Sequence, residues 1–237
     1  MSDIKRFDLI QQAINAFKKH KATVNYLEIG VQTGLCFFKI KADKKIAVDP
    51  NFIIKITKKV KAYIKNFSNF NNQYFELTSD DFFSQKHQYL KDIGGLDVVF
   101  IDGLHLYEQV VIDIENSLKY LNEGGIILLH DCNPPTETAS LRGMSPAEVR
   151  ATNPPNWTGE WNGDVWKAIM HIRTERKDVQ VMVFDCDYGI GMVRKGTPDK
   201  TFTFSKEEIS QLTYQDLLDN RVEYLNLKAP EEFAEIL

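Results

Sequence analysis

The stretch VVFIDGLHLYE, residues 98–108, brings a carboxylate and an imidazole together at the end of an apolar run. Asp102 follows the β-forming residues directly, and His105 comes three positions later. A histidine next to a carboxylate can act as a general base, and both side chains can bind a divalent metal. Gly103 lies between them and predicts a sharp turn. The alternative is a structural histidine that only bonds a backbone carbonyl.

This loop belongs to a series of short apolar runs separated by helix-like segments. The last two runs are apolar on successive residues, as is typical of strands covered on both faces. Apolar residues three and four positions apart predict amphipathic helices over 4–19 and 107–121. Strands that alternate with helices predict an α/β fold with a doubly wound parallel sheet. The predicted strands are 26–30, 45–50, 73–79, 96–103 and 124–131.

The end of the chain breaks this alternation. DVQVMVFDCD and YGIGMVRKG are strand-like runs with almost nothing between them, which predicts an antiparallel hairpin. Residues 206–237 are typical of one or two polar helices that cover a sheet edge or mediate association. The predicted organisation is one domain over 1–200, with an N-terminal helix and a lid or acceptor loop over 132–163. A helical extension over 201–237 is expected to pack on it.

Each predicted strand ends in an acid or a glycine, at the sheet edge where open α/β sheets bind ligands. Gly30 and Gly34 follow the first strand and allow a tight turn beside a bound group. A pyrophosphate-binding loop favours G-x-G-x-x-G, but Gln32 stands at the middle position. Asp49, about 20 residues further on, suits a ribose diol. The pattern therefore indicates a nucleoside without a pyrophosphate.

Taken together, LEIGVQTG, IAVDP, FIDGLH and GGIILLHD resemble the class I S-adenosylmethionine-dependent methyltransferases, over residues 20–195. The last two motifs are similar to a subgroup that includes sugar O-methyltransferases of macrolide assembly and cephalosporin-hydroxylase-like proteins. The resemblance implies a Rossmann-like seven-stranded sheet with a C-terminal antiparallel hairpin, in the order 3-2-1-4-5-7-6. It also implies O-methylation of a small or sugar-containing metabolite, with S-adenosylmethionine as the cofactor.

The resemblance further implies a role for individual cofactor-binding residues. The methionine part of the cofactor is expected near the glycine loop, the ribose at an acid after the second strand, and the adenine after the third. Asp102 is expected on the same side as the cofactor. The cofactor-binding residues are thus Glu28, Gly30, Gly34, Asp49, Ser79, Asp80, Asp81 and Asp102.

For the reaction, the resemblance implies that His105 is the general base, with Asp102 beside it. It also implies a divalent metal, Mg²⁺ or Mn²⁺, held by Asp102 and Asp131. Metal-dependent relatives tend to carry an acid where this chain has His130, and an imidazole ligand shifts the preference from Mg²⁺ toward Mn²⁺, Fe²⁺ or Zn²⁺. His130 and Asp131 can converge only if the strand ends before them; otherwise His130 is a core residue.

The acceptor side is expected in PPNWTGEWNGDVW, residues 154–166, which holds all three tryptophans. Aromatic side chains in a glycine-containing loop predict a lid over the acceptor. Alternatively, they only pack the loop against the domain, and Trp166 is expected in the core. SPAE at 145–148 predicts the start of a short helix.

The overall composition and net charge indicate which kinds of binding partner to expect. Hydrophobic residues make up 43% and the net charge is −4, so nucleic acid is not expected as a partner. The lysine-rich span 39–65 is interpreted as a solvated helix face or as an anion-docking patch. Cys36, Cys132 and Cys186 lack metal-ligand spacing and fit a reducing cytoplasm. No stretch reaches the length of a membrane span, so no membrane partner is expected. A homo-oligomer is left open.

Two rival functions follow from the same residues. A nicotinamide-dependent oxidoreductase of the short-chain type needs Tyr-x-x-x-Lys soon after the fifth strand, and the only match, Tyr224 to Lys228, lies beyond the hairpin. The other rival is a relative that binds the cofactor without methyl transfer, or a hydroxylase-like enzyme that uses the metal for oxygen chemistry.

Overall fold

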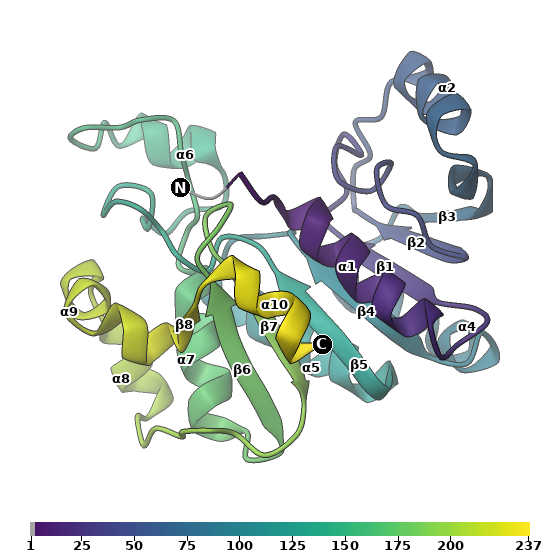
Figure 1. Ribbon diagram of the computed structural model, residues 1–237. Helices are drawn as coiled ribbons and strands as arrows, with labels where there is room; N and C mark the ends of the chain where they lie inside the picture. The colour runs from purple at the N-terminus through teal and green to yellow at the C-terminus, as the bar shows by residue number, and fades with distance from the viewer. Residues whose placement is uncertain (1–2) are drawn as a thin grey trace.

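One sheet of eight strands organises the chain in the order β3-β2-β1-β4-β5-β7-β6-β8 (Figure 1). The structure is a computed structural model and describes residues 3–237. The first five strands run parallel, and β7 is antiparallel to both β5 and β6. The strands are β1 (Asn25–Ile29), β2 (Lys44–Val48), β3 (Asn72–Phe75), β4 (Leu96–Ile101), β5 (Leu121–Leu129), β6 (Val179–Phe184), β7 (Ile190–Lys195) and β8 (Leu227–Lys228).

The predicted fold class, strand order and hairpin are confirmed, with two differences in detail. The short strand β8 is added beside β6, so the sheet has one strand more than predicted. The third strand is shorter than predicted and ends at Phe75, because Thr78 already caps the helix that begins at Ser79. Residues 32–39, between β1 and β2, form turns in place of a regular crossover helix.

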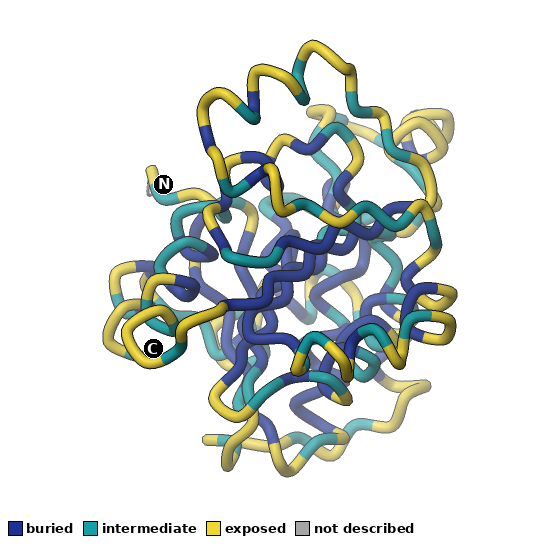
Figure 2. Tube along the Cα trace, turned by 90° about the vertical axis from the view of Figure 1, so that its right-hand side faces the viewer, coloured by how far each residue is buried: buried dark blue, intermediate teal, exposed yellow. Residues whose placement is uncertain are grey.

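Helices cover both faces of the sheet, and alternate strand residues pack against each layer. Leu27 and Val99 belong to one apolar cluster with α5 and α7, whereas Tyr26 and Val98 belong to another with α1 and α10. Figure 2 shows this buried centre in dark blue. The longer helices are α1 (Arg6–Lys18), α2 (Ile56–Lys65), α5 (Tyr107–Tyr120), α7 (Val165–Glu175) and α9 (Tyr214–Leu225). The shorter ones are α3 (Ser79–Gln85), α4 (His87–Asp92), α6 (Pro146–Ala151), α8 (Lys206–Gln211) and α10 (Phe233–Ile236).

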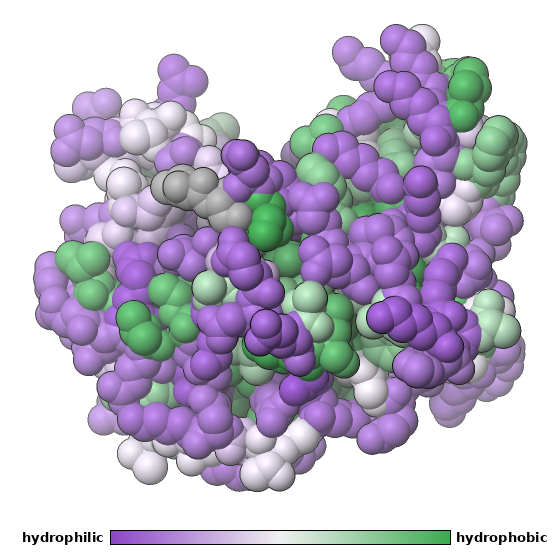
Figure 3. Space-filling model, viewed as in Figure 1, coloured by the Kyte–Doolittle hydropathy of each residue, from purple (hydrophilic) through white to green (hydrophobic). Residues whose placement is uncertain are grey.

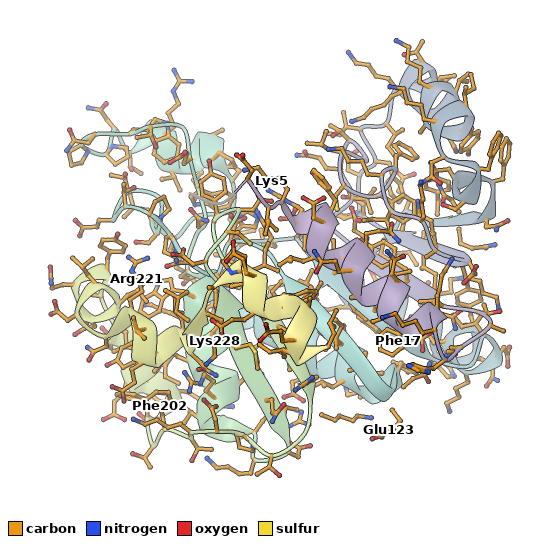
Figure 4. All side chains as sticks on the ribbon, in the orientation of Figure 1. Lys5, Phe17, Glu123, Phe202, Arg221 and Lys228 are labelled. Carbon is orange, nitrogen blue, oxygen red and sulfur yellow. The ribbon has the colours of Figure 1, made fainter. Side chains whose placement is uncertain are left out.

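The C-terminal extension packs along the β6 edge of the sheet. The guanidinium of Arg173, in α7, donates to the backbone carbonyls of Glu223 and Tyr224 near the end of α9. Phe233 packs edge-to-face on Phe184, with ring centroids 5.0 Å apart. Lys228, in β8, lies beside the sheet edge, below α9 and its Arg221 (Figure 4). These residues therefore cover a strand edge. Among residues 3–237, no helix is long and apolar enough to cross a bilayer.

Gly30 joins β1 to the loop that carries the first motif. Its φ is +84°, and a Cβ built there would lie 2.0 Å from the backbone oxygen of Asp102. The sequence predicted a close backbone approach to a ligand at this glycine. The close approach in the structure is to the end of β4, which brings two of the predicted motifs into contact.

Replacing Gly30 with alanine should therefore destabilise the fold. The matched control is Gly94→Ala, because Gly94 has a φ of +85° but a Cβ at its position would have no atom within 4 Å. We expect the control to lose about 1 kcal/mol of unfolding free energy from backbone strain, and Gly30→Ala to lose about 3 kcal/mol or more. Urea unfolding measures both. Equal losses of unfolding free energy in the two variants would show that the clash between the added Cβ and the Asp102 carbonyl has no energetic cost.

Candidate active site

A cavity of about 1360 Å³ lies beyond the carboxyl ends of the central strands. The segment that includes the start of α6 borders it on one side, and the segment before α2 borders it on the other. Figure 3 shows the surface hollowed between these two lobes, and Lys5, another lining residue, lies between them in Figure 4. The predicted site residues that line it are Glu28, Gly30, Asp49, Ser79, Asp80, Asp102, His105, His130 and Asp131.

Two predicted residues lie outside this lining. Gly34 is in the turn after β1, where a Cβ would meet the ring of Phe38 at 2.5 Å. Glycine is therefore required at position 34 because the turn packs tightly against Phe38. Asp81 lies in the first turn of α3, where its backbone N–H donates to Thr78 Oγ1 and its carboxylate accepts from the same hydroxyl. Asp80 and Ser79 are thus the members of that group that face the cavity.

Asp49 is positioned at the end of β2 by backbone hydrogen bonds to both carboxylate oxygens. Oδ2 accepts from the N–H of Gln32 at 2.7 Å, and Oδ1 accepts from the N–H of Asn51 at 2.8 Å. Each oxygen keeps a further lone pair that can accept from a ligand. The glycine loop and the end of β2 are therefore tied together by the residue predicted to meet a ribose.

Glu28 is a buried carboxyl at the base of the cavity. The hydroxyl of Tyr26 donates to Oε2 at 2.5 Å from the same face of β1. Burial raises the pKa of Glu28 to about 7, although the hydrogen bond from Tyr26 opposes the shift. The thiol of Cys36, in the turn after β1, also opposes the rise in the pKa of Glu28. Glu28 thus lies beside a side chain of the turn that follows β1.

The segment after β3 is joined to α5 by hydrogen bonds from the side-chain amide of Gln109. The amide of Gln109 donates to Asp113 Oδ1 at 3.1 Å and to Ser79 Oγ at 3.3 Å. Burial raises the pKa of Asp113 to about 6. This end of the cavity therefore presents amide, hydroxyl and carboxyl groups, which suit the polar edge of a heterocycle.

The centre of the site is a cluster of two carboxylates and two imidazoles. Asp102 Oδ1 lies 3.6 Å from Nε2 of His105 and 3.4 Å from Nδ1 of His130. Asp131 Oδ2 lies 3.3 Å and 2.8 Å from the same two nitrogens. One oxygen of each carboxylate thus faces both rings.

The other oxygen of each carboxylate is held by a residue outside the cluster. The guanidinium of Arg6, in α1, donates to Asp102 Oδ2 at 2.7 Å. The amide of Asn162 donates to Asp131 Oδ1 at 2.6 Å. These bonds fix the direction in which each carboxylate faces the imidazoles.

The charges in the cluster stabilise one another. Burial alone would raise the pKa of Asp102, but the neighbouring His130, His105 and Arg6 hold it well below its usual range. Burial lowers the pKa of His130, but Asp131 and Asp102 outweigh this and raise it to about 10. The same two carboxylates raise the pKa of His105 against burial.

His105 is positioned by the loop that follows β5. Its ring stacks on Trp161, with centroids 4.7 Å apart and planes 23° from parallel. Gly163 has a φ of +63°, and a Cβ there would lie 2.1 Å from the backbone oxygen of His105. Gly103, in contrast, does not have a positive φ, and its Cβ would reach only Ile29, at 3.4 Å. The prediction that the turn depends on Gly103 was therefore wrong.

The same loop is connected to α5. Asp164 Oδ1 accepts from the N–H of Tyr107, the first residue of that helix, at 2.7 Å, and Asp164 Oδ2 pairs with Arg142. Neither Asn162 nor Asp164 caps α7 with its side chain, since Asn162 bonds Asp131 and Asp164 bonds α5. Trp166 is fully buried, as predicted, and Trp161 is the tryptophan that lines the cavity.

His130 and Asp131 converge because β5 ends at Leu129 and Asp131 takes a φ of +63°. This left-handed residue turns the second carboxylate toward His105. Ligand atoms of Asp102, His105 and Asp131 all lie within 4.8 Å of one another, and Nδ1 of His105 and Nε2 of His130 are buried without a hydrogen-bond partner. These residues fit a divalent metal, with His105 in the group where the sequence predicted His130.

Arg6 and Asp187 are two residues of this site that the sequence did not indicate. Asp187 lies between β6 and β7 and accepts from both the backbone N–H and Nε of Arg6, at 3.0 and 2.8 Å. The only signal for Arg6 is a cation at the start of a helix, a position that ordinarily favours acids. Asp187 carries no signal beyond its place in a hairpin turn.

The chain is similar to methyltransferases in sequence and in fold. Residues 27–132 match a family model described as a methyltransferase domain. A curated relative, the uncharacterised protein R132 of Acanthamoeba polyphaga mimivirus, is 28% identical over 130 residues. That match spans 53% of this chain and 58% of the relative, so just over half of each protein is compared.

Three solved methyltransferases share the fold at low identity. An O-methyltransferase from Bacillus cereus in complex with SAH is 13% identical, with a TM-score of 0.53 over 82% of this chain and 83% of its own. The O-methyltransferase TomG from Streptomyces achromogenes, in complex with SAM, is 11% identical, with a TM-score of 0.54 over 81% of this chain and 81% of its own. The SAH-bound methyltransferase PaMTH1 from Podospora anserina is 16% identical, with a TM-score of 0.51 over 83% of this chain and 80% of its own. The predicted resemblance is therefore confirmed as a methyltransferase domain over residues 27–132, and the sheet shares the fold of these solved methyltransferases.

Proposed function

We propose that the protein is an S-adenosylmethionine-dependent methyltransferase that methylates a hydroxyl of a small or sugar-containing metabolite. The observation that carries this proposal is the joint placement of two groups in one cavity. Asp49, held by the glycine loop, lies at one part of the lining, and the cluster around His105 lies at another. Two of the structural neighbours, from Bacillus cereus and Streptomyces achromogenes, are O-methyltransferases, which supports the O-directed reaction.

The cofactor-binding roles follow from the chemistry of each lining residue. Asp49 would accept hydrogen bonds from the two ribose hydroxyls, because each of its oxygens has a free lone pair. Ser79 and Asp80 would border the adenine. Glu28, Gly30 and Asp102 would lie beside the methionine part.

The catalytic step requires alignment of the acceptor hydroxyl with the sulfonium methyl and removal of one proton. We assign proton removal to Nε2 of His105, the nitrogen that faces Asp102 and Asp131. The two carboxylates stabilise the imidazolium that forms. Trp161 holds the ring plane by stacking and excludes water from that side.

A divalent metal would be held by Asp102 and Asp131 together with an imidazole. Such an ion lowers the pKa of a bound hydroxyl. His130 is the ligand that the sequence suggested, and His105 is the one whose Nε2 completes the compact group. Because Nε2 cannot both bind a metal and accept a proton, His105 has one of these roles.

The rival functions differ in how well the lining residues support them. The same oxygen and nitrogen donors could hold iron for hydroxylase-like chemistry, so that alternative rests on the metal cluster. For a nicotinamide-dependent oxidoreductase, Tyr224 and Lys228 would have to face the cofactor. They lie in α9 and β8, away from the cavity lining, so this function has no support.

Cofactor binding tests the role of Asp49. We expect Asp49→Ala to weaken S-adenosylmethionine binding by about 10- to 100-fold, because hydrogen bonds to a charged group are lost. Isothermal titration calorimetry measures the affinity. The matched control is Asp43→Ala, which removes a carboxylate that also accepts from a backbone N–H but lies outside the cavity lining. Unchanged affinity in Asp49→Ala would contradict the assignment.

Turnover tests the role of His105. We expect His105→Gln to keep cofactor affinity within a few-fold but to lose about 10²- to 10⁴-fold in turnover. Release of S-adenosylhomocysteine with a panel of hydroxylated acceptors provides the readout, and exposed His87→Gln is the control. If the His105 variant turns over as fast as the parent, the base assignment is wrong.

Metal binding tests the carboxylate cluster independently of activity. We expect Mn²⁺ to bind the unmodified chain, and Asp131→Asn to weaken that binding at least about tenfold, since a charged ligand is lost. Electron paramagnetic resonance of free Mn²⁺ measures it. Comparing His105→Gln with His130→Gln identifies the imidazole ligand. Absence of Mn²⁺ binding to the unmodified protein would reject this metal site.

A further inference from the structure

Helix α2 carries a continuous apolar ridge that is exposed to solvent. Ile56, Val60 and Ile64 follow one another at intervals of four and are 81%, 52% and 71% exposed. The ridge continues past the helix through Phe67 and Phe70, which are 76% and 66% exposed. Isolated exposed apolar side chains are normal, but a contiguous row of five indicates an interaction surface. We call these five residues the α2 ridge.

The ridge lies on the side of α2 away from the protein. Ala62 is the buried residue of the helix, and at 100° per residue it lies opposite Val60. An ordinary surface helix buries its apolar face and exposes its polar face. Here the apolar face is exposed, and α2 projects from the body of the molecule in Figure 1. Figure 3 shows green side chains at that upper corner, bordered by purple ones.

Lysines flank the ridge, and no acid accompanies them. Residues 50–75 contain five lysines, no arginine and no aspartate or glutamate. With a net charge of −4 for the whole chain, the remaining residues carry −9, because −9 and +5 make −4. On the helix, Lys61 and Lys65 lie on one flank of the ridge and Lys59 on the other. The surface is therefore apolar at its centre and cationic at its borders.

This charge pattern selects among the partners that could cover the ridge. A symmetric dimer through α2 would place the same face of both copies together. The three lysines that flank the ridge in each copy, six in all, would then meet without one acidic partner in either segment. An anionic lipid surface instead offers an apolar layer for the ridge and negative headgroups for the flanks. The lysine stems can extend along the ridge and keep their charge in the headgroup layer.

We propose that the α2 ridge and its flanking lysines dock the protein on an anionic lipid surface. No membrane partner was expected from the sequence, because no stretch could span a bilayer. A helix that lies in the interface needs no such stretch. Ile53, which lines the cavity and is half-exposed, precedes the ridge by three residues, so docking would bring this part of the cavity lining close to the lipid. The proposal does not depend on methyl transfer.

Vesicle co-sedimentation of the full chain tests this proposal. We expect binding to phosphatidylcholine vesicles that contain about a third phosphatidylglycerol, and much weaker binding to pure phosphatidylcholine or at high salt. Ile56→Ser with Ile64→Ser should abolish binding. Lys61→Glu with Lys65→Glu should weaken it by more than about 25-fold, at about fivefold for each lysine removed. All four side chains are exposed, so circular dichroism should show unchanged folding.

Matched controls and the opposite outcomes complete the test. Val222→Ser and Lys91→Glu change one exposed apolar residue and one exposed lysine away from α2, and both should bind like the parent. Absence of binding to the anionic vesicles would overturn the proposal. So would a concentration-dependent dimer in analytical ultracentrifugation that Ile56→Ser with Ile64→Ser dissociates, because the ridge would then belong to a second copy.

Discussion

The site depends on how the chain holds two aspartates side by side at the carboxyl ends of adjacent strands. Asp102 and Asp131 are largely removed from water, and an unpaired buried carboxylate costs several kcal/mol. In each aspartate this cost is offset by a hydrogen-bond donor at one carboxylate oxygen and by imidazole nitrogens near the other oxygen. The fold therefore has to bring a cation from α1 and an amide from the loop before α7 to the same place.

This requirement explains contacts that otherwise look unrelated. Arg6 reaches the cluster because Asp187 holds both its side chain and its backbone at the hairpin between β6 and β7. Asn162 reaches it because Gly163 packs directly against the backbone of His105. Gly30 packs against the Asp102 carbonyl and brings the glycine loop to the cluster. The N-terminal helix, the hairpin and the loop after β5 are thus tied to a single arrangement of charges.

The fold could be predicted from sequence because it follows from local patterns. Continuous apolar runs indicated the central strands, and two adjacent runs at the end indicated the hairpin. The strand-end acids were predictable for the same reason, since the carboxyl ends of parallel strands lie at one edge. The short strand β8 was not predictable, because two residues carry no periodicity.

What sequence could not supply was the set of long-range partners. Arg6 lies 96 positions from Asp102, and no pattern along the chain connects them. The direction of Asp131 depends on one left-handed residue, and its effect appears only in three dimensions. From the sequence, the lysines of α2 were interpreted as a solvated helix face or as an anion-docking patch. The outward position of the apolar ridge could not be predicted, because it depends on the packing of Ala62 in three dimensions.

The most direct test of the central claim is a crystal structure of the protein with S-adenosylhomocysteine and Mn²⁺. We predict the ribose hydroxyls on Asp49 and the thioether sulfur on the side of the cavity that holds Asp102, His105 and Asp131. A nucleoside bound elsewhere, or oriented with its sulfur away from that cluster, would contradict this claim.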